Sequence, residues 1–292
     1  MRRIITAITA AMLAAMPLLA QETSSYSALW TDLSVAHPLP YGLTVDAGLG
    51  FRTLDALENA NRFDANIGLD YKIGKHFKVG VSYTFIYRHY LSETEYKYQG
   101  NHDYSSYQGL TVTETDADGE TQTYRYKGYN VDAAHWAPRH RFALDLTADK
   151  RFRKTLRVSL RERYQYTHQA ARDIDRTRYR VDSYDADGNV SAWEDPEVVT
   201  KHKNAWDRHL LRSRLKLSID RKGWQWEPYV SGELHNNMGD SWHLDKVRLA
   251  AGADYSITKQ HKLSIAYVFT HENDDDGNEN IHALSIGYRF KF

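Results

Sequence analysis

The chain has 292 residues, and its 38 lysines and arginines balance its 38 aspartates and glutamates, with a pI near 7.3. The aromatic content of 13% argues against global disorder, and the neutral balance gives no electrostatic footprint for nucleic acid, so no nucleic-acid partner is expected. The absence of cysteine excludes disulfides, thiolate nucleophiles and cysteine-ligated metal sites, and the length suits one large β domain or two ordinary domains.

The first twenty residues have the three parts of a secretory signal peptide. Met1-Arg2-Arg3 is a short basic head, residues 4–19 are uncharged and largely apolar, and Ala20 supplies a small residue at the expected cleavage point. We therefore predict a signal peptide over 1–20, Sec-type export and a single domain over 21–292. The alternative is an uncleaved membrane anchor, for which the segment is short. Since no later stretch has the length and apolarity of a spanning helix, insertion into a membrane would require strands.

Alternation of apolar and polar residues recurs almost to the last residue and predicts an all-β chain. Between residues 77 and 87, apolar and aromatic side chains occupy the odd positions, while Lys78, Gly80, Ser82 and Thr84 occupy even ones. The candidate strands lie at 29–37, 41–53, 61–73, 77–87, 139–149, 155–168, 208–220, 223–236, 247–257, 263–270 and 280–292. Because a single-chain bacterial barrel normally has an even number of strands, we expect either ten or twelve.

These segments predict an antiparallel transmembrane β-barrel of 10–12 strands with two long extracellular β-hairpin loops. Most candidates are longer than usual soluble strands and have at least the roughly 9–11 residues that a tilted strand needs to cross a bilayer. Longer and tight connections alternate at 54–60, 72–78, 92–138, 150–154, 169–207, 220–224, 237–243, 258–262 and 272–279. Such alternation is typical of outer-membrane barrels. A soluble sandwich or lipocalin-like barrel is the alternative, because alternation alone does not say which face points outward.

The two longest connections, 92–138 and 169–207, each contain Asp-Ala-Asp-Gly between β-prone stretches and are each expected to form a hairpin. Both are rich in aromatic residues. Exposed aromatic side chains bind a glycan, a peptide or a partner protein, or they stabilise hairpins by cross-strand packing. The candidate binding residues are Tyr96, Tyr98, Tyr104, Tyr107, Tyr124, Tyr126, Trp136 and Trp193.

The last eight residues resemble the C-terminal signal of bacterial outer-membrane proteins. Ser285, Gly287, Phe290 and Phe292 fill the fixed places of that signal, and the apolar residues of the segment share one face. Together with the export signal, this resemblance predicts location in the bacterial outer membrane. The expected partners are the insertion machinery and outer-membrane lipid.

Several short motifs carry a broader resemblance. They are Leu29-Trp30-Thr31-Asp32-Leu33, Gly50-Phe51-Arg52, Arg157 with Arg161-Glu162-Arg163, and Arg212 with Arg214. Over nearly the whole mature chain these motifs resemble a family of small bacterial outer-membrane β-barrels that is catalogued as a domain of unknown function. The resemblance implies the fold and the location, and it brings no catalytic residues.

The polar face of the strands predicts a charged lumen. Basic residues on two neighbouring strands form a double row, with acidic residues on the strands at either side. The members of this charge ladder are Asp145, Asp149, Arg157, Arg161, Arg163, Arg212, Arg214, Lys216, Glu227 and Glu233. One interpretation is a conduction path whose basic wall attracts anions. The other, which we favour, is a lumen filled by side chains that form salt bridges across strands.

Two residues break the pattern of their strands. Glu162 falls on the lipid-facing positions, where a charge is costly at mid-depth. Pro228 lies where a closed barrel needs a backbone N–H donor, so we expect a β-bulge there.

Catalytic chemistry has little support in the sequence. Ser213 and His209 share a face of one strand but stand about 13 Å apart along it, and only His168 of the preceding strand offers a second histidine. No metal site, cofactor or catalytic residue is predicted. Three function classes remain: a small structural or channel-like barrel, a barrel that binds a ligand through its aromatic loops, and a membrane-embedded hydrolase.

Overall fold

The computed structural model describes residues 24–55, 57–115, 119–152, 155–239, 242–274 and 277–292. The predicted signal peptide and most of the first Asp-Ala-Asp-Gly sequence lie outside the described residues. Contacts divide the chain into two compact units. The first unit contains the described residues up to Thr84 together with those of Phe142–Tyr166 and Arg208–Phe292, and the second contains those of Phe85–Arg141 and Thr167–Asp207.

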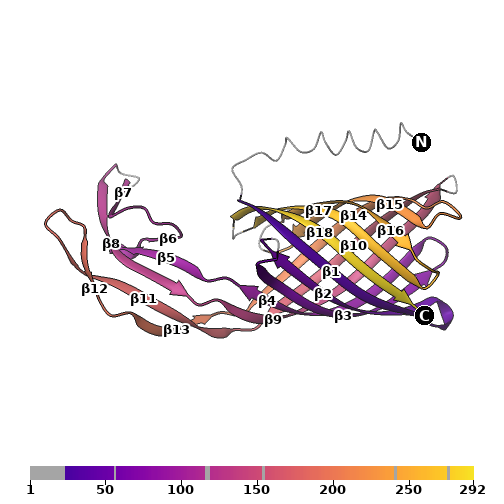
Figure 1. Cartoon of the computed structure of the whole chain (residues 1–292), viewed down its shortest axis with the longest axis horizontal. Coiled ribbons are helices and arrows are strands. Elements are labelled where there is room, and N and C mark those ends of the chain that lie inside the picture. The colour runs from indigo at the N-terminus through magenta and orange to yellow at the C-terminus, as the bar shows by residue number, and fades with distance from the viewer. Residues whose placement is uncertain (1–23, 56, 116–118, 153–154, 240–241, 275–276) are drawn as a thin grey trace. The chain divides into compact units, whose positions relative to one another are not determined.

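Within the described residues, eleven strands form a closed barrel, which confirms the all-β barrel prediction (Figure 1). Around the barrel their order is β1-β18-β17-β16-β15-β14-β10-β9-β4-β3-β2. The bounds are β1 Ser24–Pro38, β2 Leu43–Leu54, β3 Asn59–Ile73, β4 Phe77–Tyr90, β9 His135–Phe152, β10 Leu156–Gln169, β14 Trp206–Ile219, β15 Trp226–Asn237, β16 His243–Ser256, β17 His261–Asp274 and β18 Gly277–Lys291. Each candidate strand of the sequence analysis corresponds to one of them.

The barrel closes through a parallel pair, so the expectation of an even number of purely antiparallel strands is wrong. β1 pairs with β18 in parallel from Ser24 opposite Glu279 to Ala36 opposite Lys291, and it pairs with β2 in the antiparallel sense. When the barrel strands are counted along the chain, successive strands of an up-and-down sheet alternate in direction, so the first, third and every other odd strand of that count, including the eleventh (β18), run the same way. An eleventh strand can therefore pair with the first only in parallel.

The strands turn their charged residues inward and their apolar residues outward. On β9, Asp145 is 8% exposed, whereas its neighbours Leu144 and Leu146 are 56% and 50% exposed. Period-two alternation on a closed sheet produces this separation, because successive side chains point to opposite faces. The lumen also holds a buried apolar cluster, whose members are Ala28, Trp30, Ala266, Val268 and Ala283.

Tight turns join β3 to β4 and β14 to β15. Gly74 and Gly223 lie in these turns with φ of 63° and 85°, the left-handed region that favours glycine. The bulge expected at Pro228 is not observed, since the β15–β16 register runs through Pro228 and shifts only at His235. On the other side, the ladder with β14 reaches only Tyr229, so Pro228 needs no N–H donor there.

The two longest connections each contain the predicted antiparallel hairpin, β7 with β8 in the first and β11 with β12 in the second, and their strands join in one sheet. β8 of the first connection and β11 of the second pair directly, from Arg176 opposite Asp132 to Arg180 opposite Gly128. The sheet order is β12-β11-β8-β5-β6, with β13 beside β11 and β7 beside β8. These strands are β5 Glu93–Tyr98, β6 Asp103–Tyr104, β7 Thr111–Thr115, β8 Thr121–Asp132, β11 Arg172–Tyr184, β12 Val190–Trp193 and β13 Glu197–Lys203.

The second Asp-Ala-Asp-Gly sequence makes the expected turn, between β11 and β12. The Asp185 carboxylate oxygen Oδ1 accepts hydrogen bonds from the N–H groups of Asp187 (3.0 Å) and Asn189 (2.7 Å), and Gly188 has φ of 85°. This is the local geometry that makes aspartate and glycine favourable in turns.

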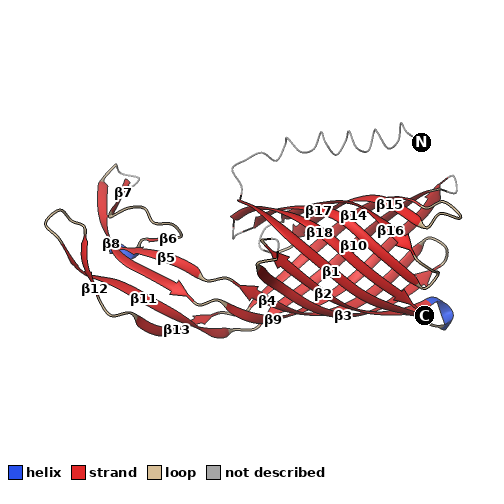
Figure 2. Cartoon of the chain, in the orientation of Figure 1, coloured by secondary structure: helices blue, strands red, loops and turns tan. Residues whose placement is uncertain are grey.

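Helical structure within the described residues is limited to two 3-10 turns, Pro40–Gly42 and Gln99–Asn101 (Figure 2). Neither of these helical segments has the length and apolarity needed to cross a membrane.

Candidate functional site

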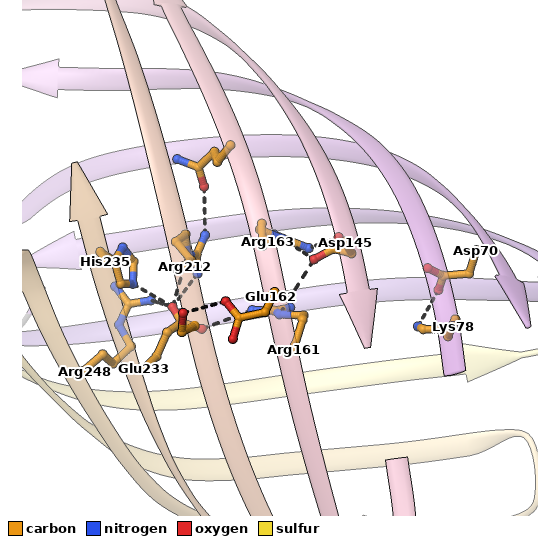
Figure 3. Close-up of polar contacts among 12 residues, drawn as sticks. Asp70, Lys78, Asp145, Arg161, Glu162, Arg163, Arg212, Glu233, His235 and Arg248 are labelled. Carbon is orange, nitrogen blue, oxygen red and sulfur yellow. Dashed lines mark hydrogen bonds and ion pairs between the residues drawn. The ribbon is translucent and has the colours of Figure 1, made fainter. Parts of the chain in front are cut away.

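Glu233 is the centre of the charge ladder inside the barrel (Figure 3). Its side chain is 5% exposed, and its two carboxylate oxygens lie 2.6 Å from Nη2 of Arg212 and 3.1 Å from Nη2 of Arg161. His235, on the same face of β15, hydrogen bonds to Oε1 of Glu233 at 2.7 Å, and Arg248 of β16 lies 3.8 Å away. Alternation on four strands thus directs the polar groups of one level of the lumen to a single carboxylate.

The acidic residues of β9 pair with the arginines of β10. Arg163 donates two parallel hydrogen bonds to Asp145, from Nε to Oδ1 and from Nη2 to Oδ2, both 2.7 Å long. Arg157 donates from Nε to both oxygens of Asp149, at 2.7 and 3.0 Å. Such bidentate pairs are among the strongest charge-assisted hydrogen bonds. The sequence assigned these residues to one face, and the structure brings them into contact.

The remaining members of the ladder lie closer to the short turns. Lys216 is 3.5 Å from Asp254, and Glu227 accepts a hydrogen bond from Ser218 at 2.8 Å. Lys262 of β17 bridges both acids, at 3.2 Å from Glu227 and 3.0 Å from Asp254. Arg214 is on the same inward-facing parity of β14, but no ion pair joins it to the other described residues.

Trp30 is a lumen residue that the sequence analysis used only as part of a family motif. It is 9% exposed, with the guanidinium of Arg52 4.6 Å and that of Arg248 5.0 Å from its ring centroid. Cations over an aromatic face are attracted by its quadrupole. Trp30 therefore connects the ionic part of the lumen to the apolar cluster. Its inward-facing parity on β1 was the signal available in the sequence.

Carboxylates on the wall formed by β2, β3 and β4 lie close against glycines of neighbouring strands. A Cβ atom placed on Gly50 would lie 2.8 Å from Oδ1 of Asp64, and one placed on Gly80 would collide with Asp70. Asp70 also binds Lys78 at 2.7 Å (Figure 3). Small residues at these positions let the acidic side chains extend along the wall.

The outward face of β10 and β14 carries a small polar group around Glu162. Ser213 donates a hydrogen bond to Oε2 of Glu162 at 2.6 Å, so the charge that falls on the outer parity has a polar partner. His209 instead contacts the hydroxyl of Tyr164 at 2.7 Å. His168 pairs with Asp207 at 2.8 Å. Among these described contacts, no histidine meets Ser213, so the arrangement supplies no serine–histidine pair.

A pocket of about 580 Å³ lies in the sheet of the second unit, which is within the usual size of ligand sites. Most of its walls are aromatic. Burial raises the pKa of Tyr126 above its ordinary value. The lining residues are Thr94, Tyr96, Tyr107, Leu110, Tyr126, Tyr129, Val190 and Trp193.

Four of the predicted loop aromatics line this pocket, namely Tyr96, Tyr107, Tyr126 and Trp193. The others have structural contacts elsewhere. Tyr98 donates a hydrogen bond to the carbonyl of Gly109, Tyr104 binds Glu114, Tyr124 stacks on His102 with centroids 3.8 Å apart, and Trp136 stacks on Tyr87 and His89 of β4.

A family model described as "Protein of unknown function (DUF2490)" matches residues 27–281. The chain belongs to this family. No curated protein and no solved structure matches the chain. The resemblance stated from the sequence motifs is thereby confirmed at the level of a domain of unknown function. The DUF2490 match contains the whole charge ladder and both long connections, while the C-terminal signal residues Ser285, Gly287, Phe290 and Phe292 follow it.

The terminal residues of this DUF2490 protein lie on β18, with Phe292 directly after it, beside β1 and β17. The Phe290 ring is 4.9 Å from that of His261, and the Phe292 ring is 5.6 Å from that of His37. The Phe292 N–H donates to the carbonyl of Ala36 at 3.1 Å. The chain end is therefore part of the barrel-closing pair. In the part of the chain that the structure describes, no cluster of three acidic or histidine residues is placed to hold a metal ion.

Proposed function

We propose that this DUF2490 protein is a bacterial outer-membrane barrel with a filled lumen, which anchors an external sheet that binds a neutral ligand. The inverted polarity of the barrel supports the membrane location: Leu144, Leu146 and Phe142 are about half exposed, while Asp145 between them is buried. Lipid solvates such an apolar exterior, and water does not. In this setting the barrel contacts outer-membrane lipid and reaches the membrane through the insertion machinery.

The filling of the lumen argues against passive conduction. Conduction requires water-lined space and sites that ions enter and leave readily. Here Glu233 engages Arg161 and Arg212 directly, and Trp30 is covered by Arg52 and Arg248. We therefore assign the ion pairs a structural role, and they stabilise the barrel rather than select permeating ions.

The aromatic pocket carries the functional part of the proposal. None of its eight lining residues is charged, and five of them are tyrosine or tryptophan. Rings of this kind pack against the apolar faces of sugars while tyrosine hydroxyls hydrogen bond to the sugar hydroxyls. A neutral glycan fits this chemistry better than a charged ligand. The residues that line the pocket belong to the two longest connections between barrel strands, and binding residues are commonly found on such connections.

The membrane part is tested with the expressed full-length protein. We expect it in outer-membrane fractions, with different gel mobility before and after boiling, since a closed barrel resists detergent until heated. Recovery in the soluble fraction with a single mobility would contradict the membrane location while leaving the binding test meaningful. Purified protein in planar bilayers should show no steady conductance, and ohmic single-channel steps would contradict the filled lumen.

The ligand part is tested by screening the purified protein on an array of neutral and acidic glycans. Trp193→Ala should abolish binding of the neutral glycans that the unmodified protein retains. Trp136→Ala is the matched control, because this tryptophan stacks on Tyr87 and His89 and does not line the pocket. Equal loss in both variants, or retention in Trp193→Ala, would remove the pocket as the binding site.

A further inference from the structure

Three arginines of the second unit converge on one tyrosine ring. The guanidinium carbons of Arg172, Arg139 and Arg88 lie 4.8, 5.3 and 5.6 Å from the ring centroid of Tyr90. Arg88 and Tyr90 have the inward parity of β4, Arg139 has that of β9, and Arg172 begins β11. The positive charges of Arg88 and Arg172 both repel the positive charge of Arg139.

The partners of these arginines are neutral. Arg139 donates from Nε to Oε1 of Gln169 at 2.7 Å and from Nη2 to the Tyr90 hydroxyl, which itself donates to Gln169 at 2.6 Å. The Nε atom of Arg88 and the Nε and Nη1 atoms of Arg172 are buried and have no hydrogen-bond partner among the described residues. Nor does any described carboxylate form an ion pair with the three. Buried cations without an anionic partner are costly.

Aromatic contacts do not supply the missing negative charge. One face of Tyr90 already stacks on His135, with centroids 5.0 Å apart and planes 10° from parallel. Arg139 additionally lies 4.8 Å from the ring of Trp206. These rings restrict the orientation of the guanidinium groups, which are planar forks with fixed donor directions. The result is a preorganised set of N–H donors.

A neighbouring cationic cluster in the same unit shows the usual solution. Arg176 lies 2.5 Å, Lys201 2.9 Å and Lys203 3.2 Å from Asp132, so three cations share one buried carboxylate. The Arg88–Arg139–Arg172 cluster has the same number of cations and a tyrosine at its centre instead of an acid. The contrast indicates that the negative charge comes from outside the chain.

We propose that Arg88, Arg139 and Arg172 form an anion-binding site for a phosphate group, at a place distinct from the residues that line the aromatic pocket. Guanidinium forks match the oxygens of phosphate with paired hydrogen bonds, and several of them can bind different oxygens of one tetrahedral group. Tyr90 and Gln169 position Arg139 through their shared hydrogen bonds. The phosphate group belongs to a soluble compound or to a lipid headgroup.

The test uses the purified protein in uncharged detergent at constant ionic strength, with inorganic phosphate as the titrant in calorimetry. We expect saturable binding that weakens roughly 10- to 100-fold in Arg172→Gln and in Arg88→Gln, since each removes hydrogen bonds to a charged ligand. Arg178→Gln is the matched control on β11, because Arg178 is partly exposed and pairs with Glu197 at 3.4 Å. Its phosphate affinity should be unchanged.

A second measurement separates binding from a structural role. In phosphate-free buffer, the melting temperature of Arg88→Gln should equal or exceed that of the unmodified protein, because the substitution removes repulsion between the arginines. Added phosphate should raise the melting temperature of the unmodified protein more than that of Arg88→Gln. Absence of saturable binding, equal affinity in all variants, or a lower phosphate-free melting temperature in both Arg88→Gln and Arg172→Gln would overturn the proposal.

The source of the phosphate is distinguished by competition. Vesicles of phosphatidylcholine with and without phosphatidic acid are added to the titration. Competition only by vesicles that contain phosphatidic acid supports the site with a lipid headgroup as its ligand. Lack of competition supports the site with a soluble phosphate compound, which the inward parity of Arg88 and Arg139 leads us to expect.

Discussion

Arg212 and Glu233 lie diagonally opposite each other on the inward face of β14 and β15, and two donors of one guanidinium bind a single carboxylate oxygen at 2.6 and 3.2 Å. The second oxygen of Glu233 serves Arg161 of the next strand. One carboxylate thus joins two rows of cations. Removing it leaves several buried charges without compensation at once.

Glu233→Ala should therefore lower the free energy of unfolding by about 3–5 kcal/mol, the usual cost of removing one partner from a buried pair. Glu227→Ala is the comparison, because the Glu227 side chain is 19% exposed against 5% for Glu233. We expect a smaller loss there. The measurement is denaturant unfolding in micelles, and equal midpoints for both variants and the unmodified protein would indicate a water-filled lumen.

Gly128 should be sensitive to substitution, because its φ is 128° and an added Cβ would collide with the Tyr179 carbonyl across the β8–β11 pair. Gly128→Ala combines backbone strain of about 1–3 kcal/mol with overpacking of similar size. Gly188→Ala is the control, since that glycine has φ of 85° and nothing within 4 Å of the added atom. Faster proteolysis of 85–141 and 167–207 in Gly128→Ala alone is expected; equal rates would contradict the joint sheet.

Asp132 makes the sheet of the second unit sensitive to acid. Burial raises the pKa of Asp132, but hydrogen bonds from Arg176, Lys201 and Lys203 outweigh it and hold the pKa below its ordinary value of 3.8. A lowered pKa in the folded state stabilises the fold at pH values above the ordinary pKa of the carboxyl group. This stabilisation is lost as the pH falls below about 4 toward the pKa of the folded state.

Amide exchange of the second unit at pH 6 and pH 3 measures this effect. Protection should fall between the two pH values, after correction for intrinsic exchange rates. In Asp132→Asn the fall should be smaller, and Asp173→Asn, whose partner His202 is exposed, should behave like the unmodified protein. The same fall in all three proteins would assign the acid sensitivity to other groups.

The C-terminal residues should control assembly. Phe290→Asp combined with Phe292→Asp places charge beside His261 and His37 on the outward face of the closing strands, where aromatic side chains favour the membrane interface. We expect export without insertion, followed by degradation. Lys291→Ala, on the opposite face, should have a much smaller effect. The amount of each variant in outer-membrane fractions measures its insertion. Normal insertion of the double variant would contradict both the assignment of these residues to an assembly signal and their proposed place at the membrane interface.

The sequence by itself determined the barrel strands, the two long connections and the charged face. Period-two alternation is a local property of the sequence, and residues such as Leu144, Asp145 and Leu146 follow it directly, with the two leucines exposed and the aspartate buried. Since the face of a residue follows from its parity, the sequence alone places Arg163 and Asp145 on the same side of the sheet. The turn at Asp185 was also predictable, because the side chain bonds to its own backbone neighbours.

Only the tertiary structure decided how distant segments pair. Strand direction around the closed sheet forces β1 to meet β18 in parallel, and nothing near Ser24 or Glu279 encodes that partner. The pairing of β8 with β11, and hence the joint sheet with its pocket, likewise depends on register between segments some fifty residues apart. The site around Tyr90 is of the same kind: Arg88, Arg139 and Arg172 come from three strands, so their common environment arises only when those strands are side by side.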